Sequence, residues 1–487
     1  MPLISKSSIL SLLLTTTLGF TANTKADNNE LPSLGASALT VLSIEKEKKL
    51  GEVIYNELRG RASVLYDPLV NEYINSLGNR LVAHAQDVKF PFTFFSVNSP
   101  DINAFAFYGG YIGVHTGLIS AADNESQLAS VLAHEIAHVT QRHMARRQEA
   151  AARQAPLTIA GIVGSLLLSV VNPQAMIATM MATTAGAQQS AINHTRGNEQ
   201  EADNIGMNIL ASAGYDPHAA GEFFTKLQQQ VRYKAEIPAF LVTHPLPDSR
   251  VTDARLRAQQ FERRFYADSL DFLMLKARVE ARYQGIKAHD TAVFEDKVKK
   301  AQGNKKFAAQ YGLAIAYLDG GQLEKAEVLL TELERASPNN LYILDTLSDL
   351  AIAKKSPASL IEKLEAAYKF RPNNSVVTLN YANVLLENND TKEAIQLLEY
   401  YLLAKPNDFL ATQILRQAYK KSENMAKYYA TSAEYYALIS NYSSAIKSAD
   451  RALSVLTPDD NAEINRLEAL KIKYRRRQTY IQQMKGA

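Results

Sequence analysis

The sequence predicts a mixed α+β domain followed by an all-α domain of helical repeats. Two runs rich in aromatic and β-branched residues lie between helical segments, and Tyr108-Gly109-Gly110 breaks the second run into strand, turn and strand. From about Tyr266 onward the pattern is helical throughout, and prolines recur there every 34 residues. A chain of 487 residues is long enough for about two to four domains.

The composition excludes several classes of protein. Hydrophobic residues make up 46% and charged residues 21% of the chain, which is usual for a folded soluble protein. The formal charge of +3 argues against nucleic-acid binding, because phosphate binders need a clustered basic surface. The short run "KYRRRQ" is typical of a solvated helix face. There is no cysteine, so any metal must be held by His, Asp or Glu.

Residues 1–26 have the pattern of a secretory signal peptide. Lys6 precedes the apolar run "ILSLLLTTTLGF", and "TKA" offers small residues for cleavage before Asp27. The alternative is a retained membrane anchor, but the apolar run is too short to span a bilayer comfortably. The predicted organisation is therefore a signal peptide (1–26), a polar leader (27–39), the α+β domain (40–264) and the repeat domain (265–487).

The α+β domain has a helix in "DPLVNEYINSLGNRLVAHA". Asp67 is suited to cap this helix, and Pro68 is suited to its first turn. Apolar residues recur in four-residue steps and predict one buried stripe, which consists of Leu69, Tyr73, Leu77 and Leu81.

The helix after the strands begins near Asn124, with Gln127 as a capping-box partner, and contains "SVLAHEIAHVTQRH". His134 and His138 are four residues apart, so both rings project from one face and can bind one zinc ion. Glu135 lies about 100° around the helix, where it can take a proton from a zinc-activated water. The alternative is a helix whose histidines only cap or pair with neighbours, but the apolar surroundings of the motif favour a buried site.

The segment 157–190 is strongly apolar and rich in methionine. Glycines interrupt its first apolar run and Asn172-Pro173 stops it, so we reject a membrane-spanning helix. One interpretation is a buried helical hairpin. The other is a mobile lid over the active site that can also touch substrate or a membrane surface. The segment lies in the sequence between the histidine motif and Glu199, and this position favours the interpretation as a lid.

The acidic stretch "GNEQEADNIG" offers the third ligand. Glu199 can complete a His/His/Glu site, and Asp203, four residues on, can accept the far N–H of a ligand histidine. Glu201 lies about 200° around the helix from Glu199, so both cannot point at one metal. His143 comes nine residues after His134 without a preceding glycine, so we expect a helix-end role for it.

The stretch "THPLPDSR" holds a histidine in a stiff turn, because two prolines follow His244. Three interpretations are open. The turn can be an ordinary surface turn. His244 or Arg250 can stabilise the oxyanion of the tetrahedral intermediate. Alternatively, His244 can occupy the fourth zinc position and keep the enzyme latent until its loop moves.

The C-terminal region repeats with a period of 34 residues, marked by Pro338, Pro372 and Pro406. Small residues in both helices and a proline after the second resemble the tetratricopeptide repeat. Leu360 stands where a small residue is expected, so the middle repeat is degenerate. Ala445 lies 51 residues beyond Ala394, which predicts an extra helix between them.

Together, "HEIAH", "EQEAD", the strand pair and "HPLPDSR" resemble the M48 family of zinc metallopeptidases over about residues 40–264. The resemblance implies a zincin-like α+β fold with one zinc ion per chain. It places the zinc on His134, His138 and Glu199, makes Glu135 catalytic with Asp203 in support, and favours the latent interpretation of His244.

In peptidases of this type an edge strand pairs with extended substrate. By resemblance, the strand that includes Asn103, Ala104 and Phe105 is the candidate. Main-chain pairing gives weak sequence selectivity, because side chains alternate away from the partner. Such a strand suits an enzyme that selects unfolded or misassembled chains.

A signal peptide before the M48-like domain and repeats after it narrow the resemblance to periplasmic members of the family. That resemblance implies a role in outer-membrane protein quality control. The partners that the resemblance implies are unfolded or misassembled outer-membrane proteins, the barrel-assembly machinery and the lipopolysaccharide-transport barrel protein. We therefore predict a periplasmic zinc metalloendopeptidase with chaperone-like activity. The alternative is a non-catalytic chaperone or scaffold whose repeats bind outer-membrane assembly factors. Three protein ligands beside a glutamate favour catalysis, because structural zinc sites usually have four protein ligands. This argument is weaker if His244 is a fourth ligand.

Overall fold

The computed structural model describes residues 42–61, 64–152, 164, 185–233, 238–284 and 290–486. The predicted signal peptide, the predicted leader and most of the predicted lid lie outside the described residues. Helix α8 (Ala185–Ser212) begins within the range predicted for the lid. Among the helices that the structure describes, none combines the length and the apolar character needed to cross a membrane.

A four-stranded sheet forms the centre of the first part of the chain, with the strand order β1-β2-β4-β3. The strands are β1 (Val64–Leu65), β2 (Thr93–Val97), β3 (Ala104–Phe107) and β4 (Tyr111–His115). β2 and β4 are parallel, and the other two neighbouring pairs are antiparallel. The predicted strand, turn and strand are confirmed, because Gly109 and Gly110 have φ of 79° and 87° and reverse the chain between β3 and β4. β3 therefore lies at one edge of the sheet.

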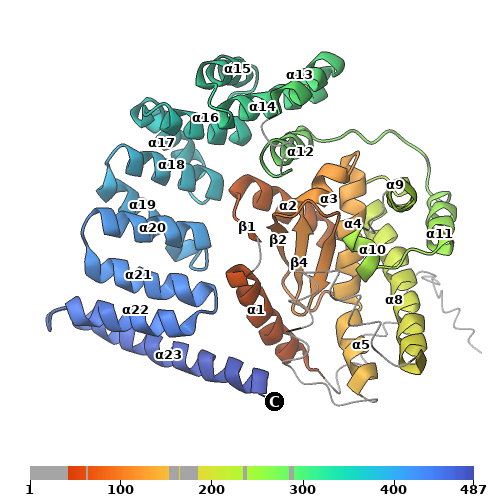
Figure 1. Ribbon diagram of the computed structural model, residues 1–487, viewed down its shortest axis with the longest axis horizontal. Coiled ribbons are helices and arrows are strands. Elements are labelled where there is room, and N and C mark those ends of the chain that lie inside the picture. Colours follow the sequence, from red (N-terminus) through yellow and green to blue (C-terminus); the bar gives the residue numbers. More distant parts are fainter. Residues whose placement is uncertain are drawn as a thin grey trace, which may run out of the picture.

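Helices cover both faces of this sheet (Figure 1). α2 (Pro68–Val82) and α4 (Glu125–Thr140) pack on the face to which Ile112 and Val114 of β4 point. α1 (Ile44–Arg61) packs on the opposite face, against Phe95, Phe105 and Phe107. The other described helices of this part are α3 (Thr116–Ala121), α5 (His143–Ala152), α9 (His218–Tyr233), α10 (Ala239–Thr243) and α11 (Asp248–Ala258).

The predicted helix starts are confirmed with one difference. The Asp67 carboxylate accepts hydrogen bonds from the backbone N–H groups of Leu69 (3.1 Å) and Val70 (3.3 Å) at the start of α2. The predicted stripe along this helix is buried. At the start of α4, the Asn124 side chain accepts from the N–H of Gln127 at 2.9 Å. The Gln127 side chain accepts from Asp123 and not from Asn124, so the reciprocal bond lies one residue earlier than predicted.

The second part of the chain is entirely helical where the structure describes it. It runs through α12 (Leu270–Arg282), α13 (Thr291–Lys300), α14 (Gly303–Asp319), α15 (Leu323–Ala336), α16 (Leu341–Ala353), η3 (Pro357–Leu360), α17 (Ile361–Phe370), α18 (Ser375–Glu387), α19 (Thr391–Ala404), α20 (Phe409–Lys421), α21 (Met425–Leu438), α22 (Tyr442–Val455) and α23 (Asn461–Gly486). In the repeat that was predicted to be degenerate, the 3₁₀ turn η3 ends at Leu360. Both α20 and α21 lie between Pro406 and α22, so the predicted extra helix is present.

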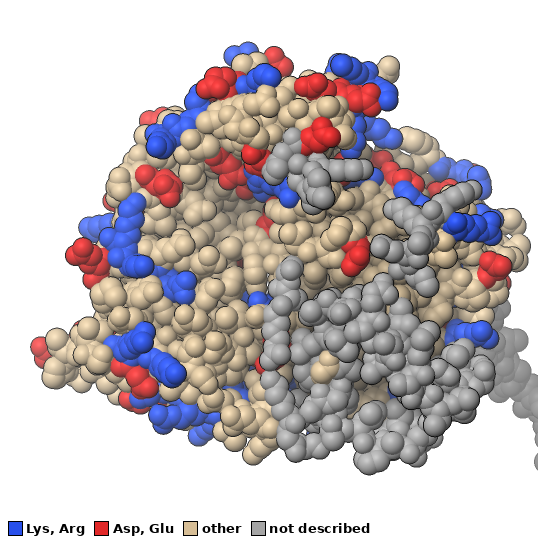
Figure 2. Space-filling model, in the orientation of Figure 1, with Lys and Arg blue, Asp and Glu red and all other residues tan. Residues whose placement is uncertain are grey.

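The helical part curves around the sheet part (Figure 1) and contacts it at several places. The Tyr66 ring stacks on Phe409 of α20 with centroids 4.3 Å apart, and Ile481 of α23 joins the core beneath α1. Arg278 of α12 is buried between Asp67 and Asp345 of α16. Figure 2 shows acidic and basic side chains interspersed on the face in view.

Candidate metal centre

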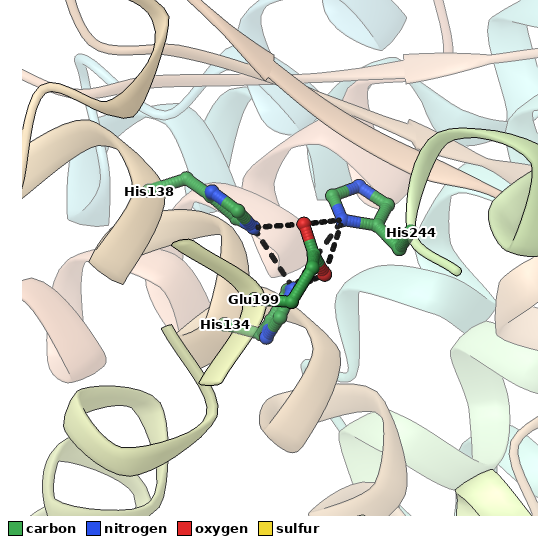
Figure 3. Close-up of side chains that lie close together, drawn as sticks. All are labelled: His134, His138, Glu199 and His244. Carbon is green, nitrogen blue, oxygen red and sulfur yellow. Dashed lines mark hydrogen bonds and ion pairs between the residues drawn. The ribbon is translucent and has the colours of Figure 1, made fainter. Parts of the chain in front are cut away.

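Four side chains from three places in the sequence meet beside the sheet (Figure 3). α4 provides His134 and His138, α8 provides Glu199, and the residue after α10 is His244. One ligand atom from each of the four lies within 4.8 Å of those from the others. The structure thus brings together the three predicted ligands and the predicted fourth one.

The close approach of α8 to α4 depends on a glycine. Gly206 of α8 lies against His134 of α4, and a Cβ atom at position 206 would lie 3.0 Å from the His134 backbone nitrogen and 3.1 Å from its Cα. Any larger residue there would push the helices apart. The two helices therefore pack closely, and Glu199, about two turns earlier on α8, comes beside both histidines.

The donor atoms are spaced as in a tetrahedral metal site. The Nε2 atoms of His134 and His138 are 3.0 Å apart. The Glu199 carboxylate oxygens lie 3.3 Å from Nε2 of His134 and 3.4 Å from Nε2 of His138. Tetrahedral N and O ligands at about 2.0–2.1 Å from zinc are about 3.3 Å apart. The residues present therefore fit a zinc-sized cation.

The charges also fit a cation. Burial alone would lower the pKa of His134, but the carboxylates of Asp203 and Glu199 outweigh burial and raise it to about 9. Without a metal, this buried cluster of acids thus holds a proton on His134. A divalent cation would supply the positive charge in its place.

The far side of the His134 ring contacts a carboxylate, as predicted. Oδ1 of Asp203 lies 3.0 Å from Nδ1 of His134, although the N–H is not well aligned with it. Asp203 in turn accepts two hydrogen bonds from Arg250, at 2.7 and 2.8 Å. Arg250 also contacts Glu199 at 3.0 Å and the carbonyl oxygen of Pro245 at 2.7 Å. The oxyanion role for Arg250 stays a prediction, and in this arrangement its guanidinium group is engaged by these three partners.

Glu135 lies next to the cluster and does not belong to the four ligand residues. Its side chain is almost fully buried. Its Oε1 atom is 3.3 Å from Nε2 of His244. Burial raises the pKa of Glu135, while His244 and His134 act in the opposite direction. A buried carboxylate of raised pKa is suited to accept and return a proton.

His244 completes the group of ligand atoms. Its Nδ1 lies 3.4 Å from Nε2 of His134 and 3.1 Å from Oε2 of Glu199. Its ring stacks on that of Phe240, with centroids 4.7 Å apart. The Phe240 backbone N–H donates to the carbonyl oxygen of Ile102 at 3.1 Å, just before β3. His244 is therefore held in place by its own loop.

The predicted substrate strand lies where pairing is possible. Ala104 and Phe105 of β3 pair with β4 on one side, and β3 is the last strand of the sheet on the other. Asn103 comes just before β3, and its backbone oxygen accepts from the N–H of His115 at 3.0 Å. β3 thus presents an edge beside α4, the helix that provides His134 and His138.

Sequence reasoning missed two residues near His138. His143 is the first residue of α5, and its ring contacts both His138 and Glu201. Glu201 does not point at the metal position, as predicted, but it contacts a neighbour of a ligand. The signal in the sequence is that His143 follows His138 by only five residues, whereas its offset from His134 bears only on direct metal binding.

Comparison with known proteins gives consistent matches. The model of peptidase family M48 matches residues 68–258, and a tetratricopeptide-repeat model matches residues 351–418. A beta-barrel assembly-enhancing protease of Yersinia pestis is 42% identical over 439 residues, 90% of each chain. The Escherichia coli K12 protein of that name is 40% identical over 452 residues, 93% of each chain. A mitochondrial metalloendopeptidase OMA1 of Arabidopsis thaliana is 35% identical over 134 residues, 27% of this chain and 24% of that one.

Proposed function

Because this chain belongs to peptidase family M48 and is a metallopeptidase, we propose that it is a zinc endopeptidase with one ion per chain. His134, His138 and Glu199 are the proposed ligands. The observation that carries this assignment is the spacing of their donor atoms, 3.0 to 3.4 Å, in a buried cluster. A His/His/Glu set is one of the three-ligand sets that catalytic zinc uses, and such sets leave the fourth position for water or substrate.

We assign the chemistry to residues around that position. When bound, zinc supplies the Lewis acid that polarises a peptide carbonyl and acidifies water. Glu135 takes the proton from the attacking water and returns it to the leaving nitrogen. Asp203 keeps His134 in the tautomer that exposes Nε2, and Arg250 keeps Asp203 in place. The edge of β3 with which no other described strand pairs, with Asn103 to Phe105, binds the extended substrate.

The enzyme is proposed to be latent in the arrangement described. Nδ1 of His244 takes the fourth position of the ligand set, and Nε2 of the same ring faces the proposed base Glu135. One side chain thus blocks both the site of the attacking water and the group that activates it. Opening requires the loop of His244 to leave the site.

Phe240 is the anchor of this loop, so the Phe240→Ala variant tests the latch. Loss of the ring removes the stacking on His244 and loosens α10. We expect the zinc-loaded variant to cleave an unfolded outer-membrane protein several-fold faster than the unaltered chain. Phe272→Ala is the matched control, since Phe272 is equally buried but lies in α12. Equal rates for the two variants would show that general loosening, and not the latch, is responsible.

The clients are proposed to be unfolded or misassembled outer-membrane proteins in the periplasm. Relatives that cover nine-tenths of the chain are named for barrel assembly and protease activity. The repeat part adds a large helical surface of the kind that binds other proteins. On this basis, the barrel-assembly machinery and the lipopolysaccharide-transport barrel protein are the proposed partners, and residues 1–26 are the proposed export signal.

A binding and cleavage assay with a purified, urea-unfolded barrel protein tests this client class. We expect zinc-loaded Glu135→Gln chain to bind the unfolded barrel and leave it intact, and His244→Ala chain to cleave it. A folded soluble protein of similar size serves as the control client. If both variants bind the barrel but neither cleaves it, the alternative is correct, and the chain is a chaperone or scaffold.

A further inference from the structure

His138 has an outer partner of a different kind from that of His134. Its Nδ1 atom lies 2.6 Å from Nδ1 of His143. On the opposite side of the His143 ring, Nε2 lies 3.1 Å from Oε2 of Glu201. Arg146 donates a hydrogen bond to the same Glu201 oxygen at 2.5 Å. The His143 side chain is only 4% exposed. Two imidazole rings and a carboxylate thus form a chain that leads away from the ligand cluster.

The turn between α4 and α5 directs His143 back at His138. Arg142 has φ of 53°, which is uncommon for a residue other than glycine and reverses the chain after α4. Its guanidinium Nε donates to Glu47 of α1 at 2.7 Å, and another nitrogen donates to the Leu42 carbonyl oxygen at 2.6 Å. These buried contacts hold the turn, so the position of the His143 ring is fixed from both sides.

The contacts allow one arrangement of protons if His138 is a ligand. Nε2 of His138 faces His134 and Glu199, so its lone pair must be free for the metal and its proton must be on Nδ1. The Nδ1 atoms of His138 and His143 are at hydrogen-bond distance, so only one of them carries a proton. Because that proton is on His138, Nδ1 of His143 accepts the hydrogen bond. The proton of His143 is then on Nε2, which points at the Glu201 carboxylate.

We propose that His143 is a positioning residue of the metal site. It sets the tautomer and ring orientation of His138 by direct contact, and Glu201 holds the His143 proton on Nε2. This inference rests on the proposed ligand set and extends it. The Asp203 carboxylate contacts His134 directly. The Glu201 carboxylate contacts the neutral His143 imidazole, and that imidazole contacts His138. Outer partners of ligand histidines typically affect metal affinity by about 10–100-fold.

Two substitutions at position 143 separate positioning from packing. His143→Leu fills most of the space and cannot accept a proton. His143→Asn keeps an acceptor close to the position of Nδ1. We expect zinc affinity, measured by competition with a chromophoric chelator, to fall about 10–100-fold in the Leu variant and to be largely restored in the Asn variant. The visible absorption of the cobalt-loaded chain should change in the Leu variant and return towards the original in the Asn variant.

The matched control is His218→Leu. His218 is also the first residue of a helix and contacts a carboxylate, with Nδ1 3.0 Å from Asp216, but it lies outside the ligand cluster. Its loss should leave zinc affinity unchanged. Glu201→Leu should weaken zinc binding in the same direction as His143→Leu, and the double variant should be no weaker than the stronger single one, because both act through one chain of contacts.

Two results would overturn the inference. One is unchanged zinc affinity in the Leu variant. The other is an equal loss in the Leu and Asn variants together with an equal fall in the unfolding midpoint of the metal-free chains, which a packing role predicts. Failure of the ligand set itself looks different, because His138→Ala would then bind zinc as tightly as the unaltered chain.

Discussion

Replacing Glu135 by Gln is expected to lower the rate of peptide hydrolysis by about 10²–10⁴-fold, the usual contribution of a positioned acid–base group. The amide has nearly the shape of the carboxylate but cannot take a proton from water at neutral pH. Glu135 is outside the group of four ligand residues, so the variant should keep its zinc. Initial cleavage rates and metal content, measured on the same samples, check both expectations.

Glu199→Gln is the control for this variant, because it alters a proposed ligand. It should lose both cleavage and zinc, whereas Glu135→Gln should lose cleavage alone. The comparison is best made in a His244→Ala background, where the proposed latch is absent. Cleavage by the Glu135→Gln chain within a few-fold of the parent rate would mean that another group is the base.

Replacing Arg278 by Ala is expected to destabilise the protein by about 3–5 kcal/mol, as the loss of one partner from a buried ion pair does. Arg278 lies 2.6 Å from Asp67 and 2.8 Å from Asp345. Its side chain is 4% exposed, and those of the two acids are 2% and 8% exposed. Without the guanidinium group, two carboxylates are left buried without a cation. The loss of stability should appear as a lower midpoint of urea unfolding. It should diminish at acid pH, because protonation of Asp67 and Asp345 in the variant removes the buried charges that lack a partner.

Arg466→Ala is the matched control for this prediction. Arg466 also pairs with two carboxylates, those of Glu434 and Glu463, but its side chain is 43% exposed. Exposed pairs contribute about 0–1 kcal/mol each, so this variant should unfold near the original midpoint. Equal effects of the two substitutions would contradict the view that Arg278 locks the repeat part to the sheet part.

Local sequence patterns predicted the elements of the fold well. Asp67 caps α2 because its carboxylate meets the first free N–H groups of the helix. The two glycines between β3 and β4 allow the positive φ that the turn needs. The way in which the helical part packs on the sheet part could not be predicted. Contacts such as Arg278 with Asp67 join residues far apart in the chain, and no local pattern marks them.

The site could be predicted where helical spacing decides it. His134 and His138 share a face of α4, and Glu199 and Asp203 share a face of α8, so both pairs were found from four-residue steps. The position of His143 depends on the left-handed backbone of Arg142. The sequence indicated only a helix-end role for His143, because its offset of nine residues from His134 does not fit a third ligand. Helical spacing does not include the turn that brings its ring back to His138.

Whether His244 keeps this metallopeptidase closed is decided by one ratio of cleavage rates. The measurement is the initial rate of cleavage of an unfolded outer-membrane barrel by zinc-loaded chain, with His244 present and with His244→Ala. We expect faster cleavage by the His244→Ala chain at the same zinc content, and no cleavage once Glu135→Gln is added. Slower cleavage by the His244→Ala chain would contradict the latch and make His244 a residue that stabilises the reaction.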